Sequence, residues 1–197
     1  MPARVRPAKK GDAAQLAVLM DMASEGLVSR VWMQMAAANE SPFEIGRTRI
    51  TGSAALPSHY SNWTVAEMNG DVAGGFAGYH VPEPYDPGDT NGLPAAYGPL
   101  LELEALAAGN WFLAVLAVFP EFRRRGLAKR LLIAAEKNAR AAGATAMALT
   151  VSRDNDGART LYLMSGFSEE ARRRRILFNP EEDCADEWIL MTKVLSR

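Results

Sequence analysis

Cysteine, histidine and long hydrophobic runs are scarce in this chain of 197 residues. Because Cys184 is the only cysteine, no internal disulfide can form, and it lies in no CxxC or Cys–His spacing typical of a metal site. We therefore expect no metal and a reducing, cytoplasmic location. No apolar run approaches the roughly 18 residues of a membrane span, and the basic N-terminus lacks the apolar core of a secretory signal. We expect no membrane partner.

An excess of charge of either sign is also missing. The 22 Lys and Arg residues are balanced by 23 Asp and Glu residues, which leaves a formal net charge of -1. The basic run Arg172–Arg175 forms no single patch if it lies on a strand, where side chains alternate between faces. We expect no nucleic-acid partner. With 48% hydrophobic residues and no dividing linker, residues 1–197 are predicted to form a single domain.

The periodicity of apolar residues predicts an α/β protein. Strands are predicted at residues 3–5, 63–68, 71–81, 111–118, 144–151, 171–178 and 187–195, and helices at 13–23, 28–38, 100–107, 127–142 and 157–164. Asn69-Gly70 is typical of the tight turn of a β-hairpin. The strand, helix and strand over 111–151 predict a right-handed parallel crossover. The segment up to Pro42 carries no recognisable chemistry.

A long acidic segment separates two of the predicted strands. Residues 82–110 contain no Lys or Arg, and they hold Glu83, Asp86, Asp89, Glu102 and Glu104. Loops of more than about 12 to 15 residues are usually functional or disordered. The segment is either a solvated loop that ends in a short helix or the wall of a site for a cationic substrate.

The connection between the strand at 111–118 and the next helix is suited to a pyrophosphate. A helix N-terminus offers unpaired N–H groups and the positive end of the helix dipole. Small residues at Gly126 and Ala128 allow an anion to approach the backbone, and Arg123, Arg124 and Arg125 add positive charge. The GxxxxGK[ST] motif of a nucleotide-hydrolysing loop is missing, so nothing indicates Mg²⁺ or phosphoryl transfer. The alternative for the arginines is a solvated turn.

Two motifs resemble those of the GNAT superfamily of N-acetyltransferases. Arg123-x-x-Gly126-x-Ala128 matches the R/Q-x-x-G-x-G/A signature of the family. After a further predicted strand, the residues from Asn155 to Phe167 match N-x-x-A-x-x-L-Y-x-x-x-G-F. The likeness covers most of the chain and is weakest at residues 28–61. It implies a GNAT-like α/β (α+β) fold: a mixed, mostly antiparallel sheet of about seven strands, flanked by helices, with an acetyl-CoA cleft at the parallel crossover.

The resemblance also implies roles for individual residues. The backbone of Leu116, Ala117 and Val118 would pair with the pantetheine arm of acetyl-CoA, and Asn155 would contact the cofactor near the same arm. Tyr162 would stand beside the sulfur as general acid, unless it is a helix tyrosine that packs in the core. The residues expected around the pyrophosphate are Arg123, Arg124, Arg125, Gly126, Leu127, Ala128 and Lys129.

The sequence offers two carboxylates as candidates for the general base. An amine with a pKa of about 10 must lose a proton before it can attack a thioester. Many protein-acetylating members of the family carry a glutamate five residues before the matched asparagine, where this chain has Thr150. Glu102 and Glu104 are the substitutes, unless they are surface carboxylates and a water chain serves instead. No covalent intermediate is needed, so Cys184 is expected to be an inert thiol.

These observations predict an N-acetyltransferase that moves an acetyl group from acetyl-CoA to a primary amine by direct attack. The acidic segment favours a small cationic acceptor. A protein N-terminal or lysine acetyltransferase and a non-catalytic acyl-CoA sensor are the alternatives. The family resemblance also implies a possible homodimer, for which Trp188–Met191 would supply an edge strand.

Overall fold

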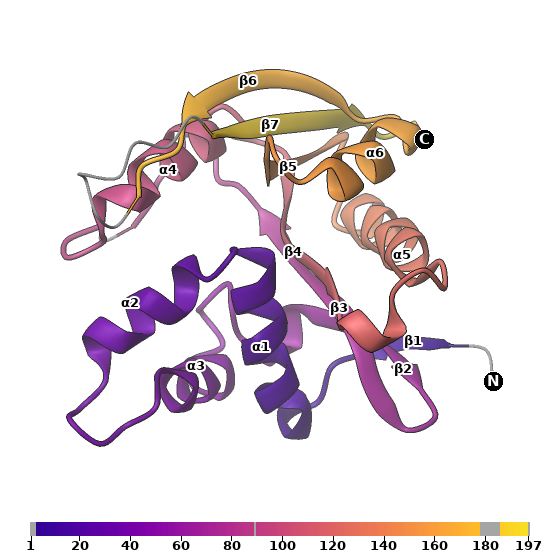
Figure 1. Ribbon diagram of the computed structural model, residues 1–197. Coiled ribbons are helices and arrows are strands. Elements are labelled where there is room, and N and C mark those ends of the chain that lie inside the picture. The colour runs from indigo at the N-terminus through magenta and orange to yellow at the C-terminus, as the bar shows by residue number, and fades with distance from the viewer. Residues whose placement is uncertain (1–2, 89, 178–185, 197) are drawn as a thin grey trace. The chain divides into compact units, whose positions relative to one another are not determined.

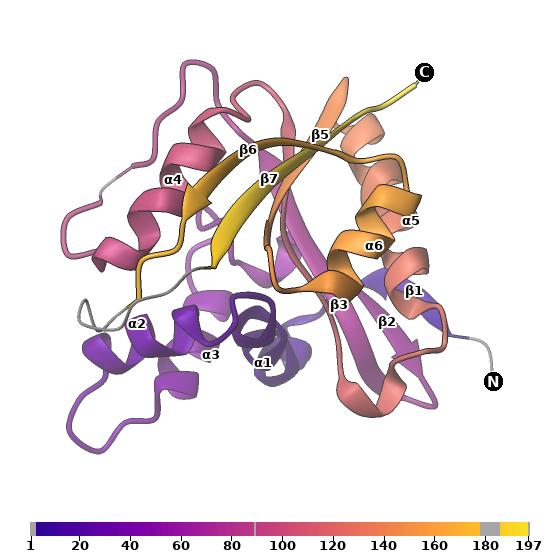
Figure 2. The same cartoon turned by 45° about the horizontal axis from the view of Figure 1, so that its top comes forward.

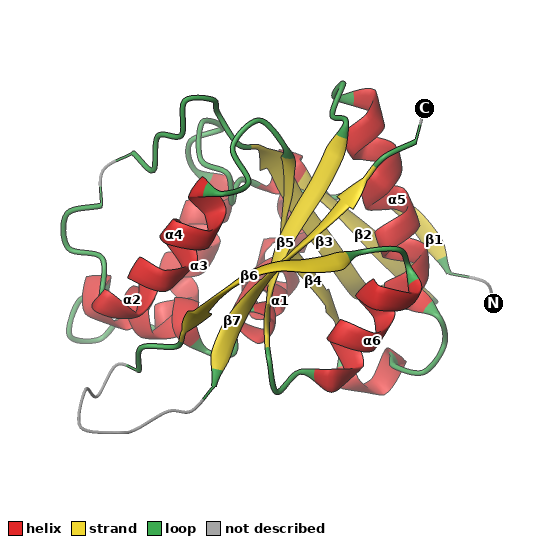
Figure 3. Ribbon diagram, turned by 90° about the horizontal axis from the view of Figure 1, so that it is seen from above, coloured by secondary structure: helices red, strands yellow, loops and turns green. Residues whose placement is uncertain are grey.

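Seven strands and six α-helices make up the described part of the chain, residues 3–88, 90–177 and 186–196 of the computed structural model (Figure 3). The strands are β1 (Arg4–Pro7), β2 (Trp63–Met68), β3 (Asp71–His80), β4 (Trp111–Val118), β5 (Ala146–Ser152), β6 (Ser168–Arg174) and β7 (Glu187–Val194). The helices are α1 (Ala13–Ala23), α2 (Leu27–Met35), α3 (Pro42–Thr51), α4 (Gly98–Ala105), α5 (Leu127–Ala141) and α6 (Asp156–Met164).

The sheet has the hydrogen-bonded order β1-β2-β3-β4-β5-β7-β6. Its β4–β5 pair is parallel, and its β1–β2, β2–β3, β5–β7 and β6–β7 pairs are antiparallel. The mixed, mostly antiparallel sheet with one parallel crossover is confirmed. The chain divides into unit 1 (Met1–Tyr79 and Ala114–Ala135) and unit 2 (His80–Leu113 and Glu136–Arg197).

The β2–β3 hairpin of unit 1 turns where the sequence predicts. Asn69 and Gly70 both have positive φ, at 53° and 93°, as a type I′ turn requires. The register pairs Met68 with Asp71 and Trp63 with Ala77, with an irregularity at Ala66/Glu67. This hairpin carries β3 to the position where it meets the end of β4.

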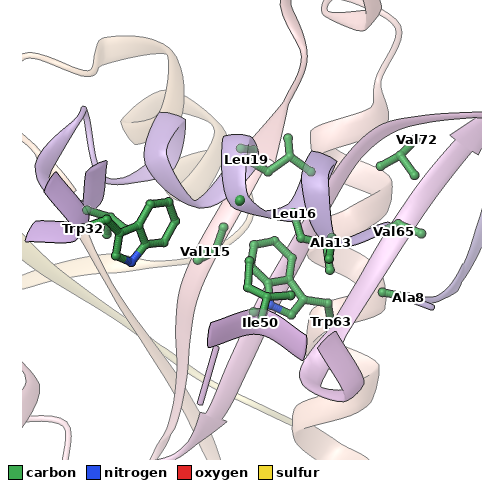
Figure 4. Close-up of a cluster of buried hydrophobic side chains, with 14 residues drawn as sticks. Ala8, Ala13, Leu16, Leu19, Trp32, Ile50, Trp63, Val65, Val72 and Val115 are labelled. Carbon is green, nitrogen blue, oxygen red and sulfur yellow. The ribbon is translucent and has the colours of Figure 1, made fainter. Parts of the chain in front are cut away.

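The core of unit 1 lies between its strands and the helices α1 to α3. Leu16 and Leu19 of α1, Ile50 of α3 and Trp63 of β2 are fully buried and belong to one hydrophobic cluster (Figure 4). Val115 of β4 belongs to the same cluster. The half of β4 that leads into the predicted cofactor loop is therefore anchored in this core.

Helix α3 was not expected from the apolar pattern. Ser41 is its N-cap, with Pro42 in the first turn and a capping box between Ser41 and Glu44. Its backbone approaches α2 closely: a Cβ added at Gly46 would lie 2.5 Å from Cζ3 of Trp32. In Figure 1 the two helices lie together with α1 at the indigo end of the chain. Helix α2 ends at Met35, earlier than the predicted residue 38.

In unit 2, β5 pairs with β7, and β7 pairs with β6. Because β7 lies between two strands, the prediction that Trp188–Met191 supplies a sheet edge is wrong. The four consecutive apolar residues of this stretch are all buried, as in a strand covered on both faces. In this part of the sheet β6 is the edge strand, and its burial alternates, so Arg172 and Arg174 are exposed and Arg173 is half-buried. The expected alternation of the basic run is confirmed within β6.

The acidic segment of residues 82–110 is closed at its base. Val81 N donates to Asn110 O at 2.9 Å, and Gly109 N donates to Val81 O at 3.1 Å. Helix α4 forms near the predicted residues 100–107 and packs against β5, β6 and β7 (Figure 2). Leu103 is its fully buried anchor.

Within the described residues, no helix has the length and apolar character needed to span a membrane. The same residues contain no cluster of three or more His, Cys, Asp or Glu side chains arranged to hold a metal ion. Cys184, Asp89 and Phe178, on which sequence predictions fall, lie outside the described residues.

Candidate active site

The loop between β4 and α5 in unit 1 has the backbone shape of an anion site. After β4 comes a 3-10 turn (Pro120–Phe122), and α5 begins at Leu127. Arg124 and Gly126 both have left-handed backbones, with φ of 62° and 73°. Left-handed residues that alternate with ordinary ones turn successive N–H groups toward one concavity, and a helix N-terminus adds its dipole. A Cβ at Gly126 would meet nothing within 4 Å, so the backbone angle, and not space, favours glycine there.

The three arginines of the loop have different partners. Arg123 Nε donates to Val118 O at 3.1 Å, and Arg125 Nη2 donates to Glu121 O at 3.3 Å. Arg125 also lies over the ring of Phe122, 5.9 Å from its centroid. Two of the three guanidinium groups thus brace the loop itself. Arg124 is exposed at the left-handed position.

The end of β4 is held against β3 within unit 1. Phe119 N donates to Ala73 O at 3.0 Å. At the next residue of β3, a Cβ on Gly74 would lie 2.6 Å from Ala117 O and 3.0 Å from Val118 Cα. Such distances are too short for any real side chain, so only glycine allows the two backbones to approach this closely. The position of Ala117 and Val118 depends on that glycine.

Asn155 begins α6 in unit 2. Its Oδ1 accepts a hydrogen bond from Ala158 N at 3.2 Å, which caps the helix. Because the amide oxygen is used in this way, the Nδ2 group is the end that can donate to a ligand.

Tyr162 stands two turns along α6 from Asn155. The residue is 7% exposed, and its ring lies 5.7 Å from that of Phe167, tilted by 58°. Burial raises the pKa of the Tyr162 phenol well above its ordinary value of 10. The phenol therefore stays protonated through the neutral range, as a proton donor must. The alternative, a helix tyrosine that packs in the core, also agrees with these observations, because both interpretations require a buried ring.

The two candidate bases on α4 differ in their surroundings. Glu102 is 61% exposed on its side chain, and Arg173 Nε donates to it at 2.6 Å. Glu104 is half-buried. Its charge acts on Tyr85, whose hydroxyl is buried and has no hydrogen-bond partner in the described residues. Burial first, and then the charges of Glu104 and Asp86, raise the pKa of Tyr85 to about 12.

Three features of the site were missed by the sequence reasoning. Tyr85 lies among prolines and carboxylates in the acidic segment, and an aromatic residue in such a polar stretch is the signal that could have found it. Gly74 lies inside a predicted strand, and a glycine at such a position is the signal of a close backbone approach. The hydrogen bond between Ser152 and Asp186 joins residues 34 positions apart and has no local signal.

The predicted residues divide between the two units. Unit 1 holds Leu116, Ala117, Val118 and the loop Arg123–Lys129, which form one continuous structure. Unit 2 holds Glu102 and Glu104 on α4, Asn155 at the N-cap of α6 and Tyr162 within α6. Thr150, on β5, pairs with Leu190 of β7.

Solved structures with the same fold are numerous, and several of them span nearly the whole chain. An N-acetyltransferase from Staphylococcus aureus Mu50 matches at 18% identity with a TM-score of 0.62, over 96% of this chain and 100% of that one. The ribosomal-protein-S18-alanine N-acetyltransferase from Escherichia coli matches at 18% with a TM-score of 0.55, over 100% and 96%. The protein yncA from Salmonella typhimurium, solved with its cofactor acetyl-CoA, matches at 18% with a TM-score of 0.58, over 100% and 96%. At such identities the likeness establishes the fold.

No curated protein matches the chain significantly. A sequence model of the acetyltransferase (GNAT) family, in contrast, matches residues 17–167. This range contains β4, the loop with its left-handed Arg124 and Gly126, and α6 with Asn155 and Tyr162. The chain belongs to the acetyltransferase (GNAT) family.

Proposed function

We propose that the protein is an N-acetyltransferase that transfers the acetyl group of acetyl-CoA to the primary amine of a small cationic molecule. The observation that carries this proposal is the loop between β4 and α5, with left-handed Arg124 and Gly126 before a helix N-terminus. A pyrophosphate fits such a loop because its N–H groups and the helix dipole both favour negative charge. Membership in the GNAT family supports acetyl-CoA as the donor.

Cofactor binding follows from the groups that each segment offers. The backbone N–H groups of residues 124–129 surround the pyrophosphate, and Arg124 and Lys129 supply positive charge. Arg123 and Arg125 contribute less to phosphate binding, because their guanidinium groups donate to backbone carbonyls of the loop. The backbone of Leu116–Val118 pairs with the pantetheine arm. Asn155 donates from Nδ2, since its Oδ1 caps α6.

The reaction is a direct attack within a ternary complex. The neutral amine nitrogen bonds to the thioester carbonyl carbon, and the resulting oxyanion accepts a hydrogen bond from Val118 N. When the C–S bond breaks, the thiolate takes the proton of the Tyr162 hydroxyl. The former amine nitrogen carries one proton more than the amide after the attack, and this proton restores the Tyr162 hydroxyl, so the products are the neutral amide and CoA. The proton lost by the ammonium group passes to Glu104. Glu102 is the weaker candidate because its side chain is 61% exposed, whereas Glu104 is half-buried.

The acidic segment supports a cationic acceptor. Residues 82–110 carry five carboxylates and no Lys or Arg. Helix α4, which holds Glu102 and Glu104, lies at the end of this segment. A negatively charged wall concentrates cations and disfavours anions.

Calorimetric titration with acetyl-CoA, CoA and a nucleotide control, followed by thiol release with amines, amino acids and peptides, tests the proposal. We expect micromolar acetyl-CoA binding and thiol release with small cationic amines. Release only with anionic acceptors would contradict the substrate class, release only with peptides would move the acceptor to proteins, and absence of binding would overturn the donor.

Two variants test the residues that carry the chemistry. Tyr162→Phe should lower kcat by about 100-fold or more, the usual contribution of a general acid, with acetyl-CoA affinity retained. Tyr60→Phe, a half-buried tyrosine of unit 1, is the matched control. Glu104→Gln should lower kcat, with a loss that shrinks as rising pH deprotonates the amine in solution, whereas Glu102→Gln should act weakly. Equal rates for Tyr162→Phe and the wild type would remove the phenol from the mechanism.

A further inference from the structure

A network of buried polar groups lies at the end of β5 in unit 2, immediately before the turn that leads to Asn155. Ser152 is 2% exposed and Asp186 is 7% exposed. Ser152 Oγ donates to Asp186 Oδ2 at 2.8 Å. The same oxygen accepts from Arg175 Nη1 at 3.1 Å, and Asp186 Oδ1 accepts from Glu187 N at 2.8 Å.

The charge of Asp186 fixes the direction of every hydrogen bond in this network. An ionised carboxylate can only accept, so the Ser152 hydroxyl must give it its single proton. The lone pairs of Ser152 Oγ are then left to accept, and Asp154 N donates to Oγ at 3.2 Å. Arg175 balances the carboxylate charge, and its guanidinium carbon lies 4.7 Å from the ring centroid of Trp188. The hydrogen bonds of the network thus all run in one direction: Asp154 N donates to Ser152, and Ser152 donates to Asp186.

Both oxygens of Ser152 are occupied by the turn that precedes α6. While Oγ accepts from Asp154 N, the carbonyl oxygen of Ser152 accepts from Asn155 N at 3.1 Å. Asn155 in turn caps α6 through Ala158 N. Three hydrogen bonds therefore hold Asn155 in place: one from the N–H of the preceding residue, one from its own N–H and one to its side-chain oxygen.

The Asp186 end of the network is also anchored to the backbone. Asp186 stands directly before β7, and Arg175 stands directly after β6. Their backbones also pair, because Arg175 N donates to Asp186 O at 3.0 Å, and Arg153 N donates to Glu187 O at 2.8 Å. The carboxylate joins the ends of three neighbouring strands to the turn.

We propose that Ser152 and Asp186 are positioning residues for acetyl-CoA, which hold the β5–α6 turn so that Asn155 presents its amide to the cofactor. The proposal rests on the proposed function, because it assigns to Asn155 a cofactor contact. Neither residue touches the cofactor. Their effect passes through the backbone of Asp154 and Asn155, so the hydroxyl of residue 152 matters for its direction and not for reactivity.

The test compares Ser152→Ala, Ser152→Thr and Asp186→Asn with the wild type. Ser168→Ala, an exposed serine of β6 in the same unit, is the control. In Ser152→Ala the turn loses the hydroxyl that holds Asp154 N, so it relaxes in the free protein and must be ordered again when acetyl-CoA binds. We therefore expect binding to weaken about tenfold, the size of the interaction that is lost. Ser152→Thr keeps a hydroxyl and should restore most of the affinity. Donor KM should rise more than kcat falls.

Amide hydrogen exchange of residues 153–159, measured without any ligand, separates failure of the inference from failure of the proposed function. Faster exchange in Ser152→Ala and Asp186→Asn, with wild-type exchange in Ser168→Ala, supports the positioning role. Unchanged exchange overturns it, and faster exchange with unchanged acetyl-CoA affinity overturns its link to the cofactor. If the wild type itself binds no acetyl-CoA, the proposed function and this link fall together, while the exchange data still decide whether the two residues hold the turn.

Discussion

Arg123 Nε donates a hydrogen bond to the carbonyl oxygen of Val118, five residues earlier in the chain, at 3.1 Å. The first residue of the R/Q-x-x-G-x-G/A signature therefore closes the loop onto the end of β4. This contact uses the nitrogen bonded to Cδ, and the side-chain nitrogen of glutamine is bonded to Cδ as well. A glutamine at position 123 would therefore place a donor nitrogen at the same point of the side chain.

A substitution series at Arg123 separates this bracing role from phosphate binding. Arg123→Gln keeps a donor at the same position and should bind acetyl-CoA within about twofold of the wild type, whereas Arg123→Ala should lose about tenfold, the usual value of a hydrogen bond from a charged group. Arg123→Lys keeps the charge but has no donor on the atom bonded to Cδ, so it should resemble alanine. Calorimetric titration measures all three. If affinity follows charge, with lysine near wild type and glutamine near alanine, Arg123 binds phosphate instead.

Gly74→Ala should damage the end of β4. The new Cβ would stand 2.6 Å from Ala117 O and 3.0 Å from Val118 Cα, so one strand must shift, at a cost of about 1–3 kcal/mol. The shift falls on the residues proposed to pair with pantetheine, so acetyl-CoA affinity should fall as well. Denaturant unfolding and calorimetry measure the two effects. Gly11→Ala, where a Cβ would meet nothing within 4 Å, is the control, and equal behaviour of both variants would contradict the prediction.

Local signals in the sequence were sufficient for much of the fold. The hairpin at Asn69-Gly70 and the crossover around α5 both depend on short-range chemistry, a turn dipeptide and an apolar run followed by an amphipathic helix. Helix α3 escaped because its apolar residues form no clear stripe, although Ser41, Pro42 and Glu44 mark its start. The interior place of β7 depends on which strands pair, and only the fully apolar run from Trp188 indicated it.

The candidate site likewise contains residues that local motifs predict and partners that only the tertiary structure reveals. Sequence motifs located the loop of Arg123–Lys129 and the helix of Asn155 and Tyr162, because each motif lies within one short segment. The partners of those segments come from distant parts of the chain: Arg173 reaches Glu102 across 71 positions, and Asp186 reaches Ser152 across 34. Contacts at such separations are set by tertiary packing, which no single-sequence pattern encodes.

Gly46→Ala tests the close packing of α2 against α3. A Cβ at Gly46 would lie 2.5 Å and 2.6 Å from Cζ3 and Cη2 of Trp32, so the variant should unfold at lower denaturant, with a loss of about 1–3 kcal/mol. Trp32 is buried and cannot swing into solvent without further cost. In a Trp32→Phe background, where the outer indole ring is gone, the same substitution should cost less. Equal costs in the two backgrounds would show that the ring is not the obstacle.

Asp12 should make the stability of unit 1 sensitive to acid. The hydrogen bond from Arg6 Nη1, at 2.7 Å, lowers the pKa of Asp12 despite partial burial. Because the folded state holds this proton less tightly than the unfolded state, the contribution is complete above the unfolded pKa of about 3.9 and is lost as pH falls below it. Asp12→Asn should therefore be less stable than the wild type at pH 6, with the gap closing toward pH 3. In an Arg6→Gln background the gap in urea midpoint should be small at both values.

Tyr162 should make stability sensitive to alkali in the opposite sense. Burial raises the pKa of the phenol in the folded state, so between the unfolded pKa of about 10 and the folded value the folded state binds more protons. The contribution is complete below pH 10 and is lost as pH rises above it, and Tyr162→Phe should flatten this fall in urea midpoint. Tyr85, whose pKa burial raises to about 12, acts in the same direction, so Tyr85→Phe and the double variant separate the two phenols. If the urea midpoint of Tyr162→Phe falls with rising pH as steeply as that of the wild type, solvent must reach the phenol. A phenol open to solvent would also ionise near pH 10, so kcat would then decrease near that pH.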